Sequence, residues 1–469
     1  MLTKFRDRIF LDRASWTPER QEYLIKQVFV ILLAGIIVGI FITRVNIYWV
    51  LALMGVLTLS LVVIWQFEAA MVLYLLVAFI SWGRTPNLVA GGSGFGKGVY
   101  ISQIMLGFLL AIWVGKYMLS ALPANRIRSG FHIPIVLYLI YCVFNVVNAF
   151  IFWDVHVSKA NQYIQVNAIE VGLRLLSAGA FVMMATSITS KKWLKLASAA
   201  VLIPGLYNLA NEATGNHIHL FVPWWSILTL MPVAYMWGVA LQPKYSVLKR
   251  VIALAVVLFA IVVVFVRGVS WVSGWLGLFV ALATVAFIVS KRVFAFCAVA
   301  AVIAGMIAWP FINSNIVQAS RTEGDFERFT LLSGALKYAT HFPFGVGLGN
   351  YRSYNTFYYE KKWGTATFTS AHGTYSQHLA ETGIPGLLLF SSILVLGCRW
   401  LLKEYKKLPP GGSKTFLLAA IGQLVGIACV AWIGDYIIPT YHNGGIITFS
   451  TTVYSWLIWG LAVAHVRLR

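Results

Sequence analysis

Charged side chains are scarce in this sequence: they make up 11% of 469 residues, against about 25% in soluble globular proteins. So few charges cannot cover the surface of a soluble protein of this size. Cysteine is equally sparse, because its four residues all lie within apolar runs and follow no metal-binding or redox spacing. These shortages exclude a soluble enzyme, a disulfide-stapled domain and a zinc module.

Long apolar runs are abundant, in keeping with 59% hydrophobic residues and a mean hydropathy of +0.79. A run of about 18 residues or more can span the hydrocarbon layer as a helix. Lipid offers no hydrogen-bond partners, so the backbone N–H and C=O groups of such a run must pair within the helix. We therefore predict an all-α, polytopic membrane helix bundle with about fourteen transmembrane helices. The predicted spans are 26–43, 47–65, 68–82, 99–118, 133–153, 169–188, 194–210, 221–241, 249–266, 268–290, 293–312, 384–402, 416–434 and 448–465.

The basic residues predict the orientation of the bundle. If residues 1–27 lie inside and the spans alternate, most of the 36 Lys and Arg residues fall in inside loops, as the positive-inside rule requires. Both termini are then cytoplasmic, and the net charge of +21 needs no nucleic-acid partner. The first 25 residues lack the pattern of a removable signal peptide. The prediction is a multi-pass protein of a bacterial inner membrane, in contact with membrane lipids.

One connection is long. Residues 313–383 separate a first bundle of eleven helices, 1–312, from the last three, 384–469, and they are rich in Tyr, Phe and Trp. Disordered segments lack such residues, so we expect an ordered outer, periplasmic loop. Within it, 324–340 has helical spacing that places Phe329, Leu332, Leu336 and Tyr338 near one face, as in an interfacial or packed helix.

Two motifs point to chemistry that we reject. Residues 91–98, GGSGFGKG, resemble a phosphate-binding loop, but Gly98 stands where Ser or Thr would bind Mg²⁺, and the segment follows a membrane helix. Glu323, Asp325 and Glu327 alternate and suit a divalent cation, yet acids before a helix are more often solvated charges. We expect neither a metal nor a cofactor.

The outward basic residues are better candidates. Arg174 lies inside a predicted span, where an ionisable group is costly and often functional; Arg267 lies at an outer junction. Guanidinium groups clamp phosphate oxygens; the alternative for each of them, an equal one, is that it reaches out to lipid headgroups. His372, just before a helix re-enters the membrane, suits a general base or a helix-end hydrogen bond. Further candidates in the loop are Arg321, Arg328, Arg352 and Tyr351.

Residues 260–400 resemble the O-antigen ligase family, which includes lipopolysaccharide O-antigen ligases and O-antigen polymerases. The resemblance rests on Arg267-Gly268, on Arg328 followed by Pro343 and the turn 345–351 (GVGLGNY), and on His372 with Gly383-Ile384-Pro385-Gly386 eleven residues later. Gly373 departs from the Asn, Ser or Gln that usually follows the His.

The resemblance implies a metal-independent, inverting glycosyltransferase at the periplasmic side. Its donor is a glycan on undecaprenyl diphosphate, and its acceptor is a hydroxyl of a lipid A core sugar. Arg267 and Arg328, with Arg174 as a weaker candidate, are then ligands of the diphosphate, and His372 is the general base. We expect His378, six residues further on, to tolerate replacement better than His372, so that it can serve as a control. A polymerase of the same family stays open as the alternative. A lipid-linked glycan flippase is the rival from another class, though no internal repeat typical of transporters is visible.

Overall fold

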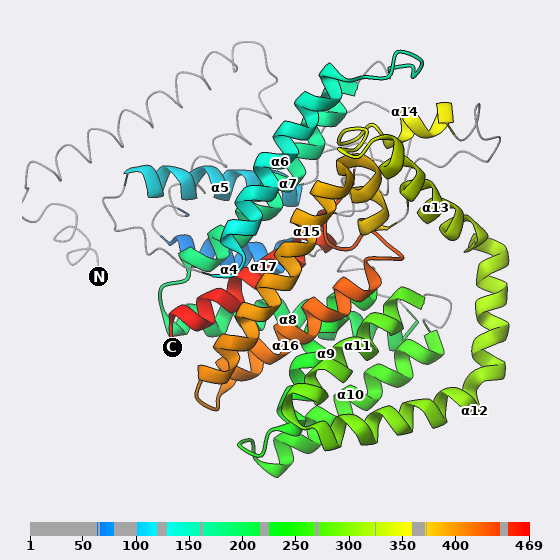
Figure 1. Cartoon of the computed structure of the whole chain (residues 1–469). Helices are drawn as coiled ribbons and strands as arrows, with labels where there is room; N and C mark the ends of the chain where they lie inside the picture. The colour runs from blue at the N-terminus through cyan, green and yellow to red at the C-terminus, as the bar shows by residue number, and fades with distance from the viewer. Residues whose placement is uncertain are drawn as a thin grey trace, which may run out of the picture. The chain divides into compact units, whose positions relative to one another are not determined.

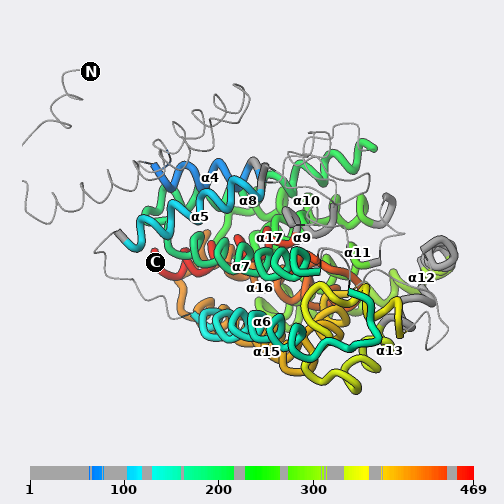
Figure 2. The backbone as a smooth tube through the Cα atoms, turned by 90° about the horizontal axis from the view of Figure 1, so that it is seen from above, coloured from blue at the N-terminus to red at the C-terminus, as the bar shows by residue number. Residues whose placement is uncertain are grey.

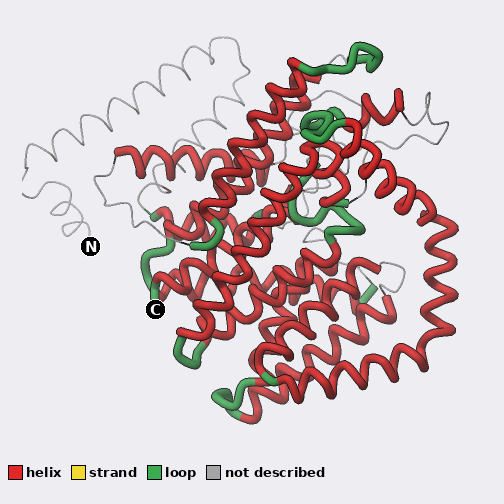
Figure 3. Tube along the Cα trace, in the orientation of Figure 1, coloured by secondary structure: helices red, strands yellow, loops and turns green. Residues whose placement is uncertain are grey.

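The computed structural model describes residues 63, 66–78, 101–119, 129–159, 163–215, 225–267, 272–323, 325–358, 371, 373–440 and 449–469. These residues form helices and connecting turns, without a strand among them (Figure 3). The predicted spans 26–43 and 47–65 lie almost entirely outside the described residues, as does the segment 91–98. The all-helical prediction is confirmed for the described part of the chain.

Figure 1 shows the order of the helices along the chain. Their bounds are α4 Phe67–Val77, α5 Ile101–Leu119, α6 His132–Ile151, α7 Tyr163–Ser187, α8 Lys191–Ala213, α9 Trp225–Leu241, α10 Val247–Arg267, α11 Val272–Val289, α12 Lys291–Glu323, α13 Asp325–His341, α14 Tyr351–Asn355, α15 Thr374–Lys407, α16 Gly412–Val430 and α17 Phe449–Arg467.

Six of these helices are long and apolar enough to cross a membrane by length and composition: α6, α7, α8, α10 over Val247–Val264, α15 and α16. Shorter apolar helices occur within α4, α5, α9 and α11. The outward faces carry the apolar side chains that lipid requires; on α6, for example, Ile133 is 72% exposed and Ile140 61%. The protein is therefore a membrane protein with several spanning helices.

The chain divides into two units by its contacts, residues 1–67 with 111–126, and residues 68–110 with 127–469. Within the second unit, α11 packs on α16 and α9, and α17 packs on α7. Helix α6 runs alongside α15, as both views show (Figures 1 and 2).

The segment predicted as a single long loop is largely helical where the structure describes it. Helix α12 continues past residue 312 to Glu323 and contains Pro310. Helix α13, over Asp325–His341, matches the predicted amphipathic helix, but its packed face differs: Tyr338 is buried while Leu336 is 54% exposed. Helix α15 begins at Thr374, well before the predicted span at 384, and bends at Gly383.

Candidate functional site

Two glycine-containing segments, far apart in the sequence, lie against each other. The amides of Val346 and Gly347 donate to the carbonyls of Ala380 (3.0 Å) and Glu381 (2.9 Å), and Ile384 N donates to Pro343 O (3.0 Å). The turn 343–350 is thereby fastened to α15 on both sides of its bend.

Glycine is required at this junction for two reasons. Gly345 and Gly383 have φ angles of 82° and 67°, which side-chain-bearing residues rarely adopt. A Cβ on Gly383 would also lie 2.1 Å from Pro343 O, and one on Gly345 would lie 2.2 Å from Glu381 O. The glycines noted in the sequence therefore bring two backbone segments into direct contact.

Asn145 of α6 joins both segments to the bundle. Its side-chain amide donates to Phe344 O (2.8 Å) and Glu381 O (3.1 Å), and its Oδ1 accepts from Leu348 N (3.0 Å). The bond to Leu348 N satisfies a buried amide, whereas Glu381 O also accepts from Gly347 N (2.9 Å) and Phe344 O from the Tyr141 hydroxyl (3.3 Å). Sequence analysis missed this role, because a lone Asn in an apolar run has no visible partner.

Arg174 lies at the centre of a buried polar cluster, with 1% of its side chain exposed. Its Nη1 contacts Glu170 Oε2 one helical turn away, its Nε donates to Tyr138 Oη (3.1 Å), and its Nη2 lies 4.0 Å from Glu381 Oε2. The residues come from α6, α7 and α15. A direct contact with substrate would require the guanidinium to exchange one of these partners.

His378 belongs to the same cluster. Its Nε2 lies 2.6 Å from Tyr138 Oη, its Nδ1 lies 2.7 Å from Thr374 O, and its ring stacks on Phe390 with centroids 4.3 Å apart. The residue is 1% exposed. The prediction that His378 tolerates replacement better than His372 stays untested, but a buried, doubly hydrogen-bonded ring is a poor choice of tolerant control.

The other sequence-predicted residues fall in different places. His372 lies outside the described residues. Arg267 is the last residue of α10, Arg321 is in α12 and Arg328 is in α13, with their backbones described and their side chains not. Arg352 is exposed on α14. Glu323 ends α12 and Asp325 begins α13, and no cluster of three potential metal ligands occurs among the described residues.

Tyr351 is a packing residue in this structure. It is fully buried and meets Tyr338 edge-on, with ring centroids 5.7 Å apart. Tyr354 and Tyr358 extend the same aromatic cluster, and the Tyr358 hydroxyl donates to Asp154 Oδ2 (2.6 Å) in the connection between α6 and α7. Burial raises the pKa of Asp154, but hydrogen bonds from Tyr358 and His156 outweigh it, so the pKa lies below its usual value.

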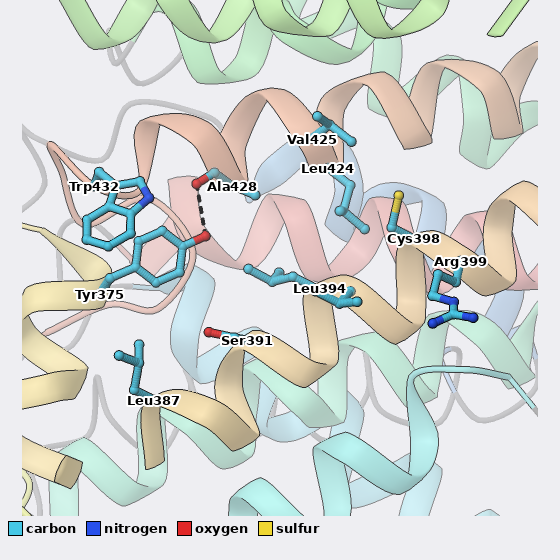
Figure 4. A pocket seen from close by; sticks show the side chains of 11 residues that line it. Tyr375, Leu387, Ser391, Leu394, Cys398, Arg399, Leu424, Val425, Ala428 and Trp432 are labelled. Atoms are coloured by element: carbon cyan, nitrogen blue, oxygen red, sulfur yellow. Dashed lines mark hydrogen bonds between the residues drawn. The ribbon is translucent and has the colours of Figure 1, made fainter. Parts of the chain in front are cut away.

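An apolar groove of about 510 Å³ lies between α15 and α16 (Figure 4). One end is formed by Tyr375 and Trp432, the other by Cys398 and Arg399. The Tyr375 hydroxyl donates to Ala428 O (2.9 Å) and ties the two helices together at the first end. Leu387 and Arg399 are twelve residues apart on α15, which corresponds to about 18 Å of helix.

The family model of the O-antigen ligase matches residues 254–391. This part of the chain is similar to the O-antigen ligase family. A search of curated proteins finds no significant match to the chain. The O-antigen ligase match contains Arg267, Arg328, His372, the turn 343–350 and the bend at Gly383; Arg174 and Asn145 lie before it, in helices that the family model does not cover.

Proposed function

We propose that the protein is a membrane glycosyltransferase of the O-antigen ligase type. It moves a glycan from undecaprenyl diphosphate to an acceptor hydroxyl, a lipid A core sugar, at the periplasmic face of a bacterial inner membrane. The observation that carries the proposal is the family match over residues 254–391. It is supported by the contact between the two glycine-containing segments that flank His372 in the sequence.

The candidate side chains then have distinct roles. His372 takes the proton from the acceptor hydroxyl as general base. Arg267 and Arg328 bind the diphosphate leaving group, which their forked donors suit without a metal ion. Arg174 is a weaker third candidate, since its guanidinium already faces Glu170, Glu381 and Tyr138. Arg321 and Arg352 are further candidates for contacts with anionic substrate groups.

The groove between α15 and α16 supports a lipid-linked substrate. Its lining is mostly apolar, and its Tyr375 end is three residues from His372. The hydrocarbon chain of the donor would lie in this groove within the membrane. Its head group would then reach the periplasmic side, where we propose that His372 acts.

Ligase and polymerase differ only in the acceptor, so a polymerase of the same family is the second candidate. A strain lacking the protein separates them by the intermediate it accumulates. Long lipid-linked polymer is expected for a ligase, and single lipid-linked repeats for a polymerase.

The general base is tested by His372→Ala and His372→Gln, assayed for glycan transfer and for membrane abundance. We expect His372→Ala to lower transfer by roughly 10²–10⁴-fold at normal abundance, and Gln to be no better because it cannot take the proton. An active His372→Gln protein would show that this residue only makes a hydrogen bond.

The orientation is tested by labelling single cysteines from the outer side of intact cells. A cysteine at Glu360 should react and one at Lys406 should not. The opposite pattern would reverse the orientation and remove the proposed site from the periplasmic face.

A further inference from the structure

The hydrogen bonds around Arg174 follow one direction through the cluster. A guanidinium only donates, so Tyr138 Oη accepts from Arg174 Nε–H, and the same oxygen lies within hydrogen-bond distance of His378 Nε2. A backbone carbonyl only accepts, so His378 Nδ1 donates to Thr374 O. A proton on both ring nitrogens would place a second buried cation next to the Arg174–Tyr138 pair, so we assign His378 as neutral, with Nε2 accepting from the Tyr138 hydroxyl.

The charge of the cluster then depends on its two carboxyl groups. Arg174 contributes one positive charge, while Glu170 and Glu381, if both ionised, contribute two negative charges. Both carboxyl side chains are 1% exposed. The other titratable group that faces Glu381 is the thiol of Cys142, which supplies no positive charge. A net negative charge buried at this depth is strongly unfavourable.

The geometry distinguishes the two carboxyl groups. Glu170 is in direct contact with the guanidinium, whereas the nearest oxygen of Glu381 is 4.0 Å from Nη2. Glu170 is therefore the ionised partner of Arg174. Glu381 also faces the side-chain amide of Gln377 and the backbone amide of Gly349. Both groups can donate to it, but neither carries the positive charge that a second buried carboxylate would need.

We propose that Glu381 is protonated in the resting protein, and that this neutral carboxyl completes a charge-balanced cluster which positions the first turns of α15. The backbone of the same residue carries the turn 343–350, since Glu381 O accepts from Gly347 N (2.9 Å) and Asn145 Nδ2 (3.1 Å). Glu381 is thus a positioning residue for the segment that follows His372. That consequence rests on the proposed function, whereas the protonation state does not.

The experiment uses the full chain purified in detergent and three variants, Glu381→Gln, Glu170→Gln and Glu381→Ala. Glutamine has the shape of a protonated glutamate, so Glu381→Gln should keep the Tm of the wild type. Glu170→Gln leaves Arg174 without its ionised partner and should lower the Tm by roughly 5–10 °C. Infrared spectra should show a protonated-carboxyl band in the wild type that is lost in Glu381→Gln. The band should also be lost in Glu170→Gln, because Glu381 is then the carboxyl left to balance the charge of Arg174.

A pH series separates this state from a merely structural role. A carboxyl that is protonated when folded and ionised when unfolded loses its contribution to stability as the pH rises. The wild-type Tm should therefore fall on raising the pH, and that part of the fall should vanish in Glu381→Gln. A Glu381→Gln protein as unstable as Glu170→Gln, or a carboxyl band unchanged by Glu381→Gln, would overturn the proposal.

Glycan transfer provides the readout for positioning. Glu381→Gln should retain transfer within about twofold, and Glu381→Ala should lose it. A protein with the expected Tm and infrared pattern but no transfer in the wild type would leave the protonation state standing and reject the proposed function alone.

Discussion

The hydroxyl of Tyr138 lies 2.6 Å from Nε2 of His378, although the two residues are 240 positions apart in the chain. This contact joins α6 to the first turns of α15. The same hydroxyl oxygen accepts from Arg174 Nε, so one side chain links a histidine, a guanidinium and two helices.

Removing that hydroxyl should destabilise the protein. Tyr138→Phe keeps the ring but leaves two buried polar groups without a partner, which costs about 1–3 kcal/mol. Thermal unfolding of the detergent-purified protein measures the loss. Tyr117→Phe is the matched control, since Tyr117 is 55% exposed. Equal Tm values for the two variants would mean that the Tyr138 hydroxyl contributes no net stability.

The bend of α15 should tolerate only glycine. Gly383→Ala forces a Cβ into Pro343 O at a φ angle of 67°, so we expect a sharp loss of membrane abundance. Gly172→Ala, in α7 with no atom within 4 Å of the added Cβ, should be neutral or stabilising by up to about 1 kcal/mol, because alanine favours helix. The prediction fails if both variants accumulate to the same level.

Filling the groove between α15 and α16 should impair the use of a lipid-linked donor. Ser391 lines the groove, so Ser391→Trp should raise the KM for that donor with little change in abundance. Leu388→Trp is the control on the same helix, since Leu388 is 64% exposed and does not line the groove. Unchanged transfer by the Ser391→Trp protein would show that the groove does not bind the substrate chain.

The Asp154–Tyr358 contact should make stability depend on acid. The pKa of Asp154 is lowered in the folded protein, so its contribution is complete above the ordinary aspartate pKa of about 3.9 and is lost as the pH falls through the lowered value. The Tm difference between wild type and Asp154→Asn should therefore shrink in acid. A difference that stays constant with pH would argue against an ionised Asp154 in the fold.

The sequence predicted helices well where a run of apolar residues is long enough to span lipid. Helices α6, α8 and α16 lie close to their predicted ranges because length and hydropathy alone determine them. The start of α15 was missed, since residues 374–382 are mixed in polarity and have no periodic apolar stripe. These residues are buried nonetheless, because their polar groups bind α6, α7 and the turn 343–350 and not lipid.

The candidate site was likewise predictable from the sequence only in part. The order of Arg, glycine turn, His and second glycine segment is a pattern along the chain, so a resemblance could be drawn from it. The pairing of Tyr138 with His378 and the role of Asn145 depend on contacts between distant segments, which no local pattern encodes. Only the spacing of Glu170 and Arg174, four residues apart on one helix, was visible in advance.

The bend at Gly383 changes the direction of α15 and also constrains the number of residues that precede it. His378 and Glu381 both precede it and lie three residues apart, so they share one face of the helix toward α6 and α7. One residue inserted between the bend and His378 would rotate that face by about 100° and turn His378 away from Tyr138. The number of residues between His378 and Gly383 is therefore constrained, because an insertion or deletion there would break the contact between His378 and Tyr138.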